Sequence, residues 1–139
     1  MKIAMIGTGY VGLVSGLCFA EFGFEISCVD KDQSRLNSIA KGVCPFFEPG
    51  LDDLLVKHLN STKRFSLSNN LSESLKEVDV VFITVGTPTK RLENEADLKD
   101  VFKVAEEISE NIGNYCVVVT KSTVPVGTTR KIKEIMSQK

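Results

Sequence analysis

The sequence lacks the features that mark several classes of protein. Its formal net charge is only −1 over 139 residues, so it has no excess of positive charge with which to bind nucleic acid. No apolar run approaches the ~20 residues of a membrane span, and a strand with a glycine turn directly after Lys2 is unlike a signal peptide. There is no internal repeat and no low-complexity tract. We therefore expect a protein that acts without nucleic acid or a membrane.

Residues that bind metals are few. The four cysteines form no C-x-x-C pair, and no cysteine has the single histidine at metal-ligand spacing, so we expect no metal site. Cys18, Cys28 and Cys116 lie in apolar runs and are expected to be small buried side chains, whereas Cys44 lies in a loop. His58 falls in a polar-flanked helical stretch, where we expect an exposed ring without a chemical role. Nothing requires an oxidising compartment, so the expected location is the cytoplasm.

Strand and helix patterns alternate along the chain. Its 139 residues suit one domain, and 42% apolar with 25% charged residues is ordinary for a globular protein. Buried or alternating apolar runs predict strands over residues 2–6, 25–29, 65–67, 80–85 and 116–120. Apolar residues at helical spacing predict helices over residues 11–22, 32–41, 51–59, 97–112 and 128–136, with a short one that ends near 78. Polar residues 90–95 are expected to form a mobile loop.

The first expected strand leads directly into a glycine turn. Gly7-Thr8-Gly9-Tyr10-Val11-Gly12 has the G-x-G-x-x-G spacing of a dinucleotide-binding turn. Gly7 permits a sharp turn, Gly9 lets the backbone approach a pyrophosphate, and Gly12 lets the helix pack on the strand. The unpaired N–H groups of residues 10–12 would then face the phosphates. The alternative is an ordinary strand–helix turn without a ligand.

Asp30 ends the second expected strand. It lies 18 residues after Gly12, close to the ~20 typical of the acid that binds the adenosine ribose. A carboxylate here accepts hydrogen bonds from both ribose hydroxyls and repels a 2′-phosphate, which favours NAD over NADP. Lys31 and Arg35 weaken this preference, because a nearby cation can receive a phosphate. The alternative is that all three are ordinary solvated residues, and we assign no role to Lys31.

Together these patterns predict an α/β fold: a Rossmann-type, doubly wound parallel sheet with helices on both faces, in a single domain over residues 1–139. In such a sheet the ligand lies across the carboxyl ends of the strands, where the strand order reverses. The loops at that edge are then residues 7–12, Asp30, residues 85–89 and residues 121–123.

Five motifs carry a resemblance to a known family. GTGYVG, VDKDQSR, FFEPGL, VGTPT and KSTVPVGTT occur in that order and span almost the whole chain. In this combination they resemble the amino-terminal, NAD-binding domain of the UDP-glucose/GDP-mannose dehydrogenase family. The glycine turn alone would not select this family, but EPGL followed by TPT and KSTVPVGT is far more selective.

The resemblance implies a set of cofactor contacts on this chain. Thr123 would in addition lie near the reacting centre and help to position water or substrate. The loop Glu48-Pro49-Gly50 is a hallmark of the family, and we assign it no role. On position alone, the hydroxyls of residues 87–89 and 122–123 fit a ligand edge as well as they fit a proline turn and a helix cap. The implied cofactor-binding residues are Gly7, Thr8, Gly9, Tyr10, Val11, Gly12, Asp30, Arg35, Val85, Gly86, Thr87, Pro88, Thr89, Ser122 and Thr123.

The resemblance also implies a reaction that this chain does not complete. The family oxidises the C6 alcohol of a sugar nucleotide such as UDP-glucose to a carboxylate, with two NAD and one water. The principal catalytic residues, a cysteine, a lysine, an asparagine and an aspartate, belong to regions beyond residue 139, together with a central helix and the sugar-nucleotide domain. We therefore expect this chain to bind NAD without catalysing the oxidation alone, and the full-length protein to be a homodimer.

The sequence also allows other functions. The chain could serve a GDP-mannose or N-acetylated UDP-sugar dehydrogenase, because the residues that select the sugar lie mostly outside it. A β-hydroxyacid dehydrogenase shares the amino-terminal fold, although FFEPGL and KSTVPVGT speak against it. A regulatory module that senses NAD without chemistry is the third class.

Overall fold

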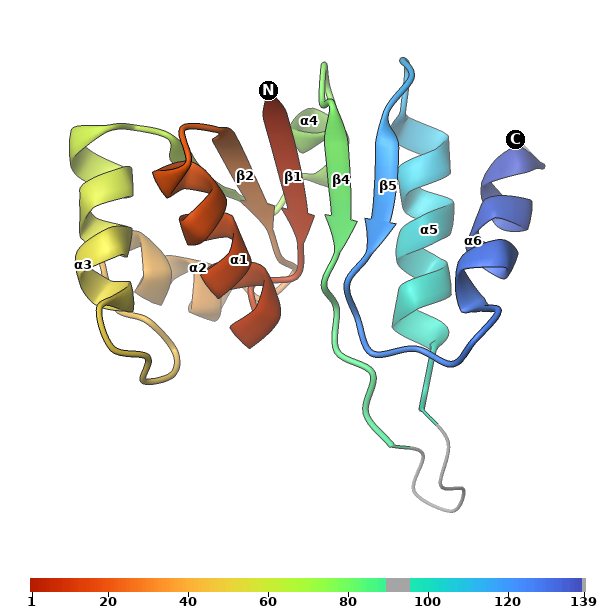
Figure 1. Ribbon diagram of the computed structural model, residues 1–139, viewed down its shortest axis with the longest axis horizontal. Coiled ribbons are helices and arrows are strands. Elements are labelled where there is room, and N and C mark those ends of the chain that lie inside the picture. Colours follow the sequence, from red (N-terminus) through yellow and green to blue (C-terminus); the bar gives the residue numbers. More distant parts are fainter. Residues whose placement is uncertain (90–95, 139) are drawn as a thin grey trace.

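The computed structural model describes residues 1–89 and 96–138 (Figure 1). The expected loop over residues 90–95 therefore lies outside the described residues. The described strands are β1 Lys2–Ile6, β2 Glu25–Val29, β3 Phe65–Ser68, β4 Val80–Ile83 and β5 Val117–Thr120. The helices are α1 Tyr10–Glu21, α2 Gln33–Ala40, α3 Leu51–Val56, the π-helical turn η1 Lys57–Ser61, α4 Leu71–Ser74, α5 Lys99–Asn111 and α6 Thr128–Ser137.

The five described strands form one parallel sheet in the order β3-β2-β1-β4-β5. In the register of this sheet, Ile6 at the end of β1 pairs with Val29 of β2 on one side and with Ile83 of β4 on the other. The chain runs outward from β1 to β3 and then crosses back to β4, so the strand order reverses between β1 and β4. This confirms the expected doubly wound topology and places the ligand edge at the ends of these two strands.

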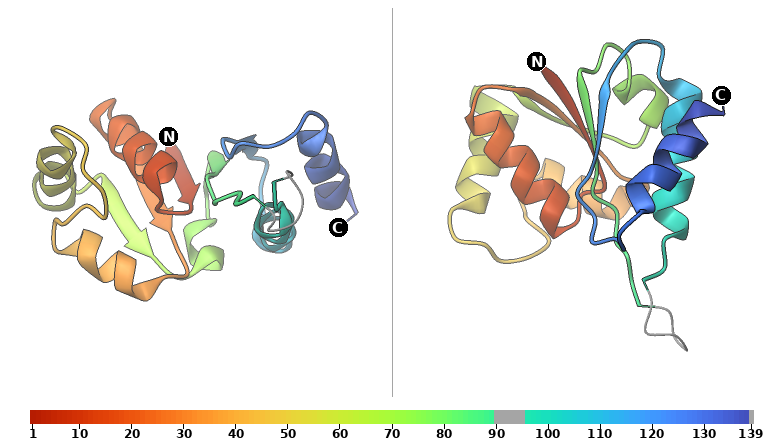
Figure 2. Two further views of the ribbon diagram at one scale, coloured as in Figure 1. Left: turned by 90° about the horizontal axis from the view of Figure 1, so that it is seen from below. Right: turned by 45° about the vertical axis from the view of Figure 1, so that its right-hand side comes forward.

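Two apolar cores lie on opposite faces of the sheet. Residues of β1 alternate between them: Ile3 and Met5 pack with α1 and α3, while Ala4 and Ile6 pack with α5 and α6. Figure 2 shows α1 and α5 on the two sides of the sheet. Because β1 is covered on both faces, its sequence is a continuous apolar run rather than an alternating one. The helices therefore hold the carboxyl end of β1 at the centre of the molecule.

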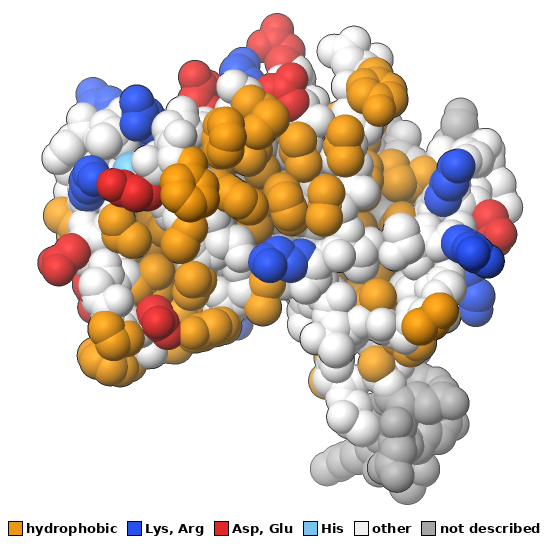
Figure 3. All heavy atoms as spheres, viewed as in Figure 1, with side chains coloured by type: hydrophobic (Ala, Val, Ile, Leu, Met, Phe, Trp, Pro, Cys, Tyr) orange, Lys and Arg blue, Asp and Glu red, His pale blue; other side chains and the backbone are white. Residues whose placement is uncertain are grey.

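One part of the sheet is only partly covered by the described helices. Val80 and Phe82 of β4 are partly buried on the α1 side, where Phe82 contacts Phe19 of α1, and Val117 of β5 is 46% exposed. Figure 3 shows hydrophobic side chains gathered over this face, beside α1. Among the described residues, no helix is long and apolar enough to cross a membrane.

Several element boundaries differ from the sequence-based predictions. The helix expected over residues 51–59 changes at Lys57 into the π-helical turn η1, and α4 ends at Ser74 rather than near 78. Glu77 has a positive φ of 56°, a left-handed conformation that does not continue a helix. The strand expected over residues 80–85 ends at Ile83, and the hydroxyl of the next residue, Thr84, donates to the carbonyl of Ile6 in β1. The remaining helices and strands are shifted by at most two residues at either end.

Three expectations about single side chains were wrong. His58 is buried, with only 1% of its surface exposed, because η1 turns its ring towards α1. Cys18 is exposed, since it lies on the outer side of α1, and Cys116 is only partly buried because it precedes the edge strand β5. Cys28 is fully buried, as expected.

Candidate functional site

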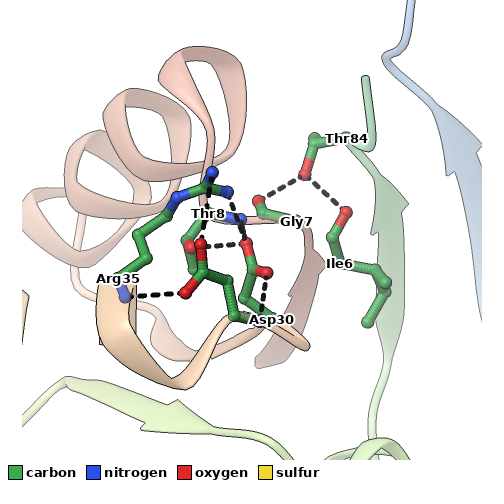
Figure 4. Close-up of polar contacts among 7 residues, drawn as sticks. Ile6, Gly7, Thr8, Asp30, Arg35 and Thr84 are labelled. Carbon is green, nitrogen blue, oxygen red and sulfur yellow. Dashed lines mark hydrogen bonds and ion pairs between the residues drawn. The ribbon is translucent and has the colours of Figure 1, made fainter. Parts of the chain in front are cut away.

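The turn after β1 brings three segments into direct contact. Gly7 has a φ of +106°, and its N–H donates to the carbonyl of Val29 at 2.8 Å. A Cβ on Gly12 would lie 1.8 Å from the carbonyl oxygen of Gly7, so the start of α1 touches the end of β1 without room for a side chain. The hydroxyl of Thr84 donates to the carbonyls of Ile6 and Gly7, both at 2.9 Å (Figure 4). The glycines at positions 7 and 12 are thus required by this crossing.

The amino end of α1 is open to a ligand. Its N-cap residue is Gly9, which supplies no capping side chain, and the first turn carries no acidic residue. No atom lies within 4 Å of the position that a Cβ on Gly9 would occupy. The N–H groups of a first helical turn have no intrahelical acceptor, and the helix dipole favours an anion there. This arrangement fits the pyrophosphate of a dinucleotide.

Asp30 follows β2 and is held by four hydrogen bonds (Figure 4). Its Oδ2 accepts from the amide of Thr8 at 2.8 Å, from the hydroxyl of Thr8 at 2.6 Å and from Arg35 at 3.1 Å. Its Oδ1 accepts from the amide of Asp32 at 2.9 Å. Thr8 is fully buried, so its side chain orients Asp30 rather than facing open space.

The charge of Asp30 is stabilised at this position. Burial by itself would raise the pKa of its carboxyl group, but the hydrogen bonds from Thr8 and Asp32 and the charge of Arg35 outweigh burial. The net effect is a pKa below the ordinary value for aspartate. The side chain is therefore an anion at neutral pH.

Both cations near Asp30 are engaged by acidic side chains. Arg35 contacts Asp30 at 3.1 Å and Asp32 at 3.7 Å, and Asp32 also caps α2. Lys31 lies 3.6 Å from Asp100 of α5. The positive charges of Lys31 and Arg35 are thus already balanced by carboxylates.

A cavity of about 490 Å³ opens at this edge of the sheet. It brings together six of the residues expected from the sequence: Gly7, Gly9, Asp30, Arg35, Val85 and Gly86. Sequence reasoning missed its other walls. Asn69 directly follows β3, so the rule of strand ends could have found it, but the residues of α5 carry no local signal. The missed lining residues are Ile6, Val29, Asn69, Leu71, Thr84, Asp100, Lys103, Val104 and Glu107, together with Lys31, to which the sequence assigned no role.

A larger hollow, of about 680 Å³, lies elsewhere on the sheet. Serines and charged residues near the amino ends of the strands line it, and its Lys2 and Lys76 are paired with Glu77 and Glu73. It contains neither the glycine turn nor Asp30. The smaller cavity therefore has the chemistry of a nucleotide site, whereas the larger hollow is a polar surface.

The remaining expected residues lie along the same edge but outside the cavity. The hydroxyl of Ser122 donates to the carbonyl of Val85 at 2.6 Å, which joins the loop after β5 to the segment after β4. Thr123 is exposed, and Thr89 pairs with Ala96 in an isolated antiparallel bridge. Tyr10, Val11, Thr87 and Pro88 likewise do not line the cavity. The structure thus separates the cavity beside Asp30 from the exposed segment near Thr123.

The fold is shared with solved sugar-nucleotide dehydrogenases. A UDP-glucose dehydrogenase from Pyrobaculum islandicum superposes with a TM-score of 0.91 at 32% identity, over 99% of this chain and 32% of the other. A GDP-mannose dehydrogenase from Pseudomonas aeruginosa superposes with a TM-score of 0.90 at 33% identity, over 100% and 33% of the two chains.

Sequence comparison agrees with the structural likeness. The curated UDP-glucose 6-dehydrogenase of Rhizobium meliloti is 49% identical over 138 residues, which are 99% of this chain and 31% of that protein. The chain thus spans about a third of the length of its relatives. The description "UDP-glucose/GDP-mannose dehydrogenase family, NAD binding domain" belongs to the family model that matches residues 1–139, so the cofactor is NAD. The chain therefore belongs to the UDP-glucose/GDP-mannose dehydrogenase family, whose NAD-binding domain it matches from end to end.

Proposed function

We propose that NAD lies across the carboxyl edge of the sheet, with its pyrophosphate at the amino end of α1 and its adenosine ribose at Asp30. The observation that carries this placement is that one cavity contains both the uncapped glycine turn and the ionised Asp30. The adenine would then lie between Leu71 and Val104, and the nicotinamide would extend towards residues 85–89 and 122–123. All fifteen residues expected from the sequence keep their proposed roles, with Thr8 acting through Asp30.

The same geometry favours NAD over NADP. Oδ1 of Asp30 accepts one hydrogen bond within the chain and keeps acceptor capacity for a ribose hydroxyl. A 2′-phosphate in that place would meet the negative charge of Asp30. Arg35 offers little compensation because Asp30 and Asp32 already surround its guanidinium.

The whole protein is proposed to be a UDP-glucose 6-dehydrogenase, which oxidises UDP-glucose to UDP-glucuronate with two NAD. The names of the relatives support this substrate, and 49% identity to the Rhizobium meliloti enzyme is the highest value among those described above. When bound, NAD supplies the hydride acceptor of the reaction. This chain would orient the cofactor, and Thr123 would help to position water or substrate at its open end.

Residues 1–139 are proposed to be the cofactor domain of this enzyme. A central helix and a sugar-nucleotide domain would complete the active site, so the chain alone would bind NAD without turning over UDP-glucose. The partly exposed apolar face of β4 and β5 supports a neighbouring domain, because parallel sheets are normally covered on both faces. We further propose that the full-length enzyme is a cytoplasmic homodimer.

A second candidate is the cofactor domain of a related dehydrogenase for GDP-mannose or an N-acetylated UDP-hexosamine. The observation in its favour is that the Pseudomonas aeruginosa GDP-mannose dehydrogenase superposes as closely as the Pyrobaculum islandicum enzyme, with TM-scores of 0.90 and 0.91. Incubation of the full-length protein with NAD and each sugar nucleotide in turn distinguishes them by the rate of NADH formation. A non-catalytic NAD sensor would form no NADH with any of them.

Calorimetric titration of the chain with NAD and with NADP tests the proposed site. We expect saturable NAD binding, much weaker NADP binding, and a loss of at least tenfold in NAD affinity for Asp30→Ala, which is ~1.4 kcal/mol. The matched control is Glu106→Ala, which changes an exposed carboxylate of α5 outside the cavity and should leave the affinity unchanged. Tighter binding of NADP than of NAD would contradict the assignment of Asp30. Turnover of UDP-glucose by the 139-residue chain would contradict its role as a cofactor domain only.

A further inference from the structure

The loop after α2 reaches the first residue of α1. The hydroxyl of Tyr10 donates to Oε2 of Glu48 at 2.5 Å. The ring of Tyr10 also packs on Phe46, with 4.9 Å between ring centroids and 50° between ring planes. Tyr10 begins α1 and belongs to the glycine turn, whereas Glu48 belongs to the FFEPGL motif 38 residues later. One side chain of the pyrophosphate turn is thus held by a loop from outside the cavity.

The continuation of this loop holds the other end of α1. Glu21, the last residue of α1, accepts hydrogen bonds from Lys57 at 2.7 and 2.8 Å. The Nε2 atom of the buried His58 lies 2.8 Å from Oε2 of the same carboxylate, and its Nδ1 lies 2.8 Å from the hydroxyl of Thr62. The carboxylate pKa of Glu21 is lowered, chiefly by the hydrogen bond from Lys57. Both terminal residues of α1 are therefore bonded to one segment, residues 44–62, which we call the α1 brace.

The middle of the α1 brace packs against α1. Leu51 and Leu55 of α3 share an apolar core with Leu13 and Leu17 of α1, and all four are at most 3% exposed. Inside the brace, the amide of Cys44 donates to the side chain of Asp52 at 3.2 Å, which closes the loop onto α3. The brace is thus a continuous support along one side of α1.

The opposite side of α1 is in contact with the sheet. Gly12 meets the carbonyl of Gly7 and the hydroxyl of Thr84, with no room for a Cβ. The first turn of α1 therefore lies between this backbone contact and the α1 brace. A binding site must be held within ~0.5 Å of its productive geometry, and residues behind the site usually supply that precision. The N–H groups that would face the pyrophosphate belong to this turn.

We propose that Tyr10 and Glu48 are positioning residues for the pyrophosphate: their hydrogen bond holds the first turn of α1 in the place where its N–H groups bind the phosphates. This inference deepens the proposed function and rests on it. It gives the Glu48 loop a role in cofactor binding that requires no direct contact with the cofactor. The Tyr10 ring contributes through Phe46, and its hydroxyl through Glu48.

A purely structural role for the pair predicts a different result. If the hydrogen bond only joined the loop to α1, its removal would lower stability and would weaken every ligand of the cavity alike. If it positions the turn, its removal weakens ligands that carry a pyrophosphate and spares adenosine, which reaches Asp30 but has no phosphate. The comparison of NAD with adenosine therefore separates the two roles.

The test is a double-mutant cycle on the 139-residue chain, with Tyr10→Phe, Glu48→Ala and the double variant, titrated with NAD by calorimetry and with adenosine by NMR. Each single variant should weaken NAD binding about three- to tenfold, which is ~0.7–1.4 kcal/mol, because the hydrogen bond that holds the first turn of α1 is lost. The double variant should lose as much NAD affinity as either single variant. The adenosine affinity of all variants should stay within twofold of that of the unsubstituted chain. Glu48→Gln should restore NAD binding, since its amide oxygen still accepts a hydrogen bond from Tyr10. The matched controls are Tyr115→Phe, at a side chain 92% exposed, and Glu106→Ala on the exposed side of α5.

Three outcomes would overturn the inference alone: unchanged NAD affinity in both single variants, equal losses for NAD and adenosine, or losses that multiply in the double variant. Failure of the unsubstituted chain to bind NAD would overturn the proposed function and the inference together. The unsubstituted chain therefore tests the proposed function, and the variants test the inference.

Discussion

The hydroxyl of Thr8 lies 2.6 Å from Oδ2 of Asp30, and the backbone amide of the same threonine lies 2.8 Å from the same oxygen. Thr8, the second residue of the glycine turn, therefore holds Asp30, the acidic residue that follows β2. A residue of the pyrophosphate turn and the proposed ribose-binding residue thus form one rigid unit.

Thr8→Val should remove the hydroxyl contact with Asp30 without changing the shape of the buried side chain. The substitution removes a buried donor and leaves Asp30 with one hydrogen bond fewer, so we expect the free energy of unfolding to fall by ~1–3 kcal/mol. NAD affinity should fall as well, because Asp30 loses a contact that orients it. Urea denaturation and calorimetric titration measure the two effects. Thr8→Ser keeps the hydroxyl and serves as the matched control, and an unchanged affinity in Thr8→Val would show that Asp30 is oriented by its other partners.

Gly12→Ala should lower the stability of the fold, whereas Gly9→Ala should lower NAD affinity and leave the fold intact. Gly12→Ala places a Cβ 1.8 Å from the backbone of Gly7, so we expect a loss of ~3 kcal/mol or more in stability and a fraction of unfolded chain. Gly9→Ala meets no atom within 4 Å at an ordinary φ of −69°, so the fold should persist. Its methyl group would occupy the space proposed for the pyrophosphate, and NAD affinity should fall at least tenfold. Thermal unfolding and NAD titration of both variants check this pair, and full NAD affinity in Gly9→Ala would place the pyrophosphate elsewhere.

The stability of the fold should depend on the ionisation of Asp30 in acid. Because its pKa is lower in the folded chain, the unfolded chain binds more protons as the pH falls. The stabilisation is complete above the unfolded-state pKa of ~3.9 and is lost as the pH falls through the folded-state value. Asp30→Asn should therefore show a shallower decline of unfolding free energy below pH 4 than the unsubstituted chain. Urea denaturation at a series of pH values measures the slope, and identical slopes would mean that Asp30 has the same pKa in both states.

The cysteines should react with a thiol reagent in an order set by exposure and by pKa. Cys18 is exposed and should be labelled first. Burial and the nearby Asp52 raise the pKa of the Cys44 thiol to about 12, and burial raises the pKa of Cys28, which is fully buried. Both should react slowly because the thiolate is the reactive form. Mass spectrometry after brief labelling at pH 8 checks the order, with Cys18→Ser as the variant that should lose the fast phase. Rapid labelling of Cys28 would indicate that α1 opens from the sheet.

The apolar periodicity along the chain predicted the alternation of strands and helices, and the spacing of Gly7, Gly9, Gly12 and Asp30 predicted the centre of the site. These features can be predicted from the sequence because they depend on residues within one turn or one strand. The resemblance to the family, which rests on five short motifs, was confirmed over residues 1–139. The contacts of all fifteen expected residues with the cofactor stay predictions.

Contacts between distant segments were decided only by the tertiary structure. Local pattern suggested an exposed His58, yet Glu21, 37 residues away, and the packing of η1 on α1 bury its ring. Thr84 looked like part of an apolar run, yet it bonds the carbonyl of Gly7, 77 residues away. The α5 residues that line the cavity and the Tyr10–Glu48 hydrogen bond are likewise contacts between segments distant in sequence. The sequence by itself determined the elements and the glycine turn, because these follow from short-range sterics and periodic burial; which side chains meet at the site depends on how those elements pack, and no local pattern encodes that.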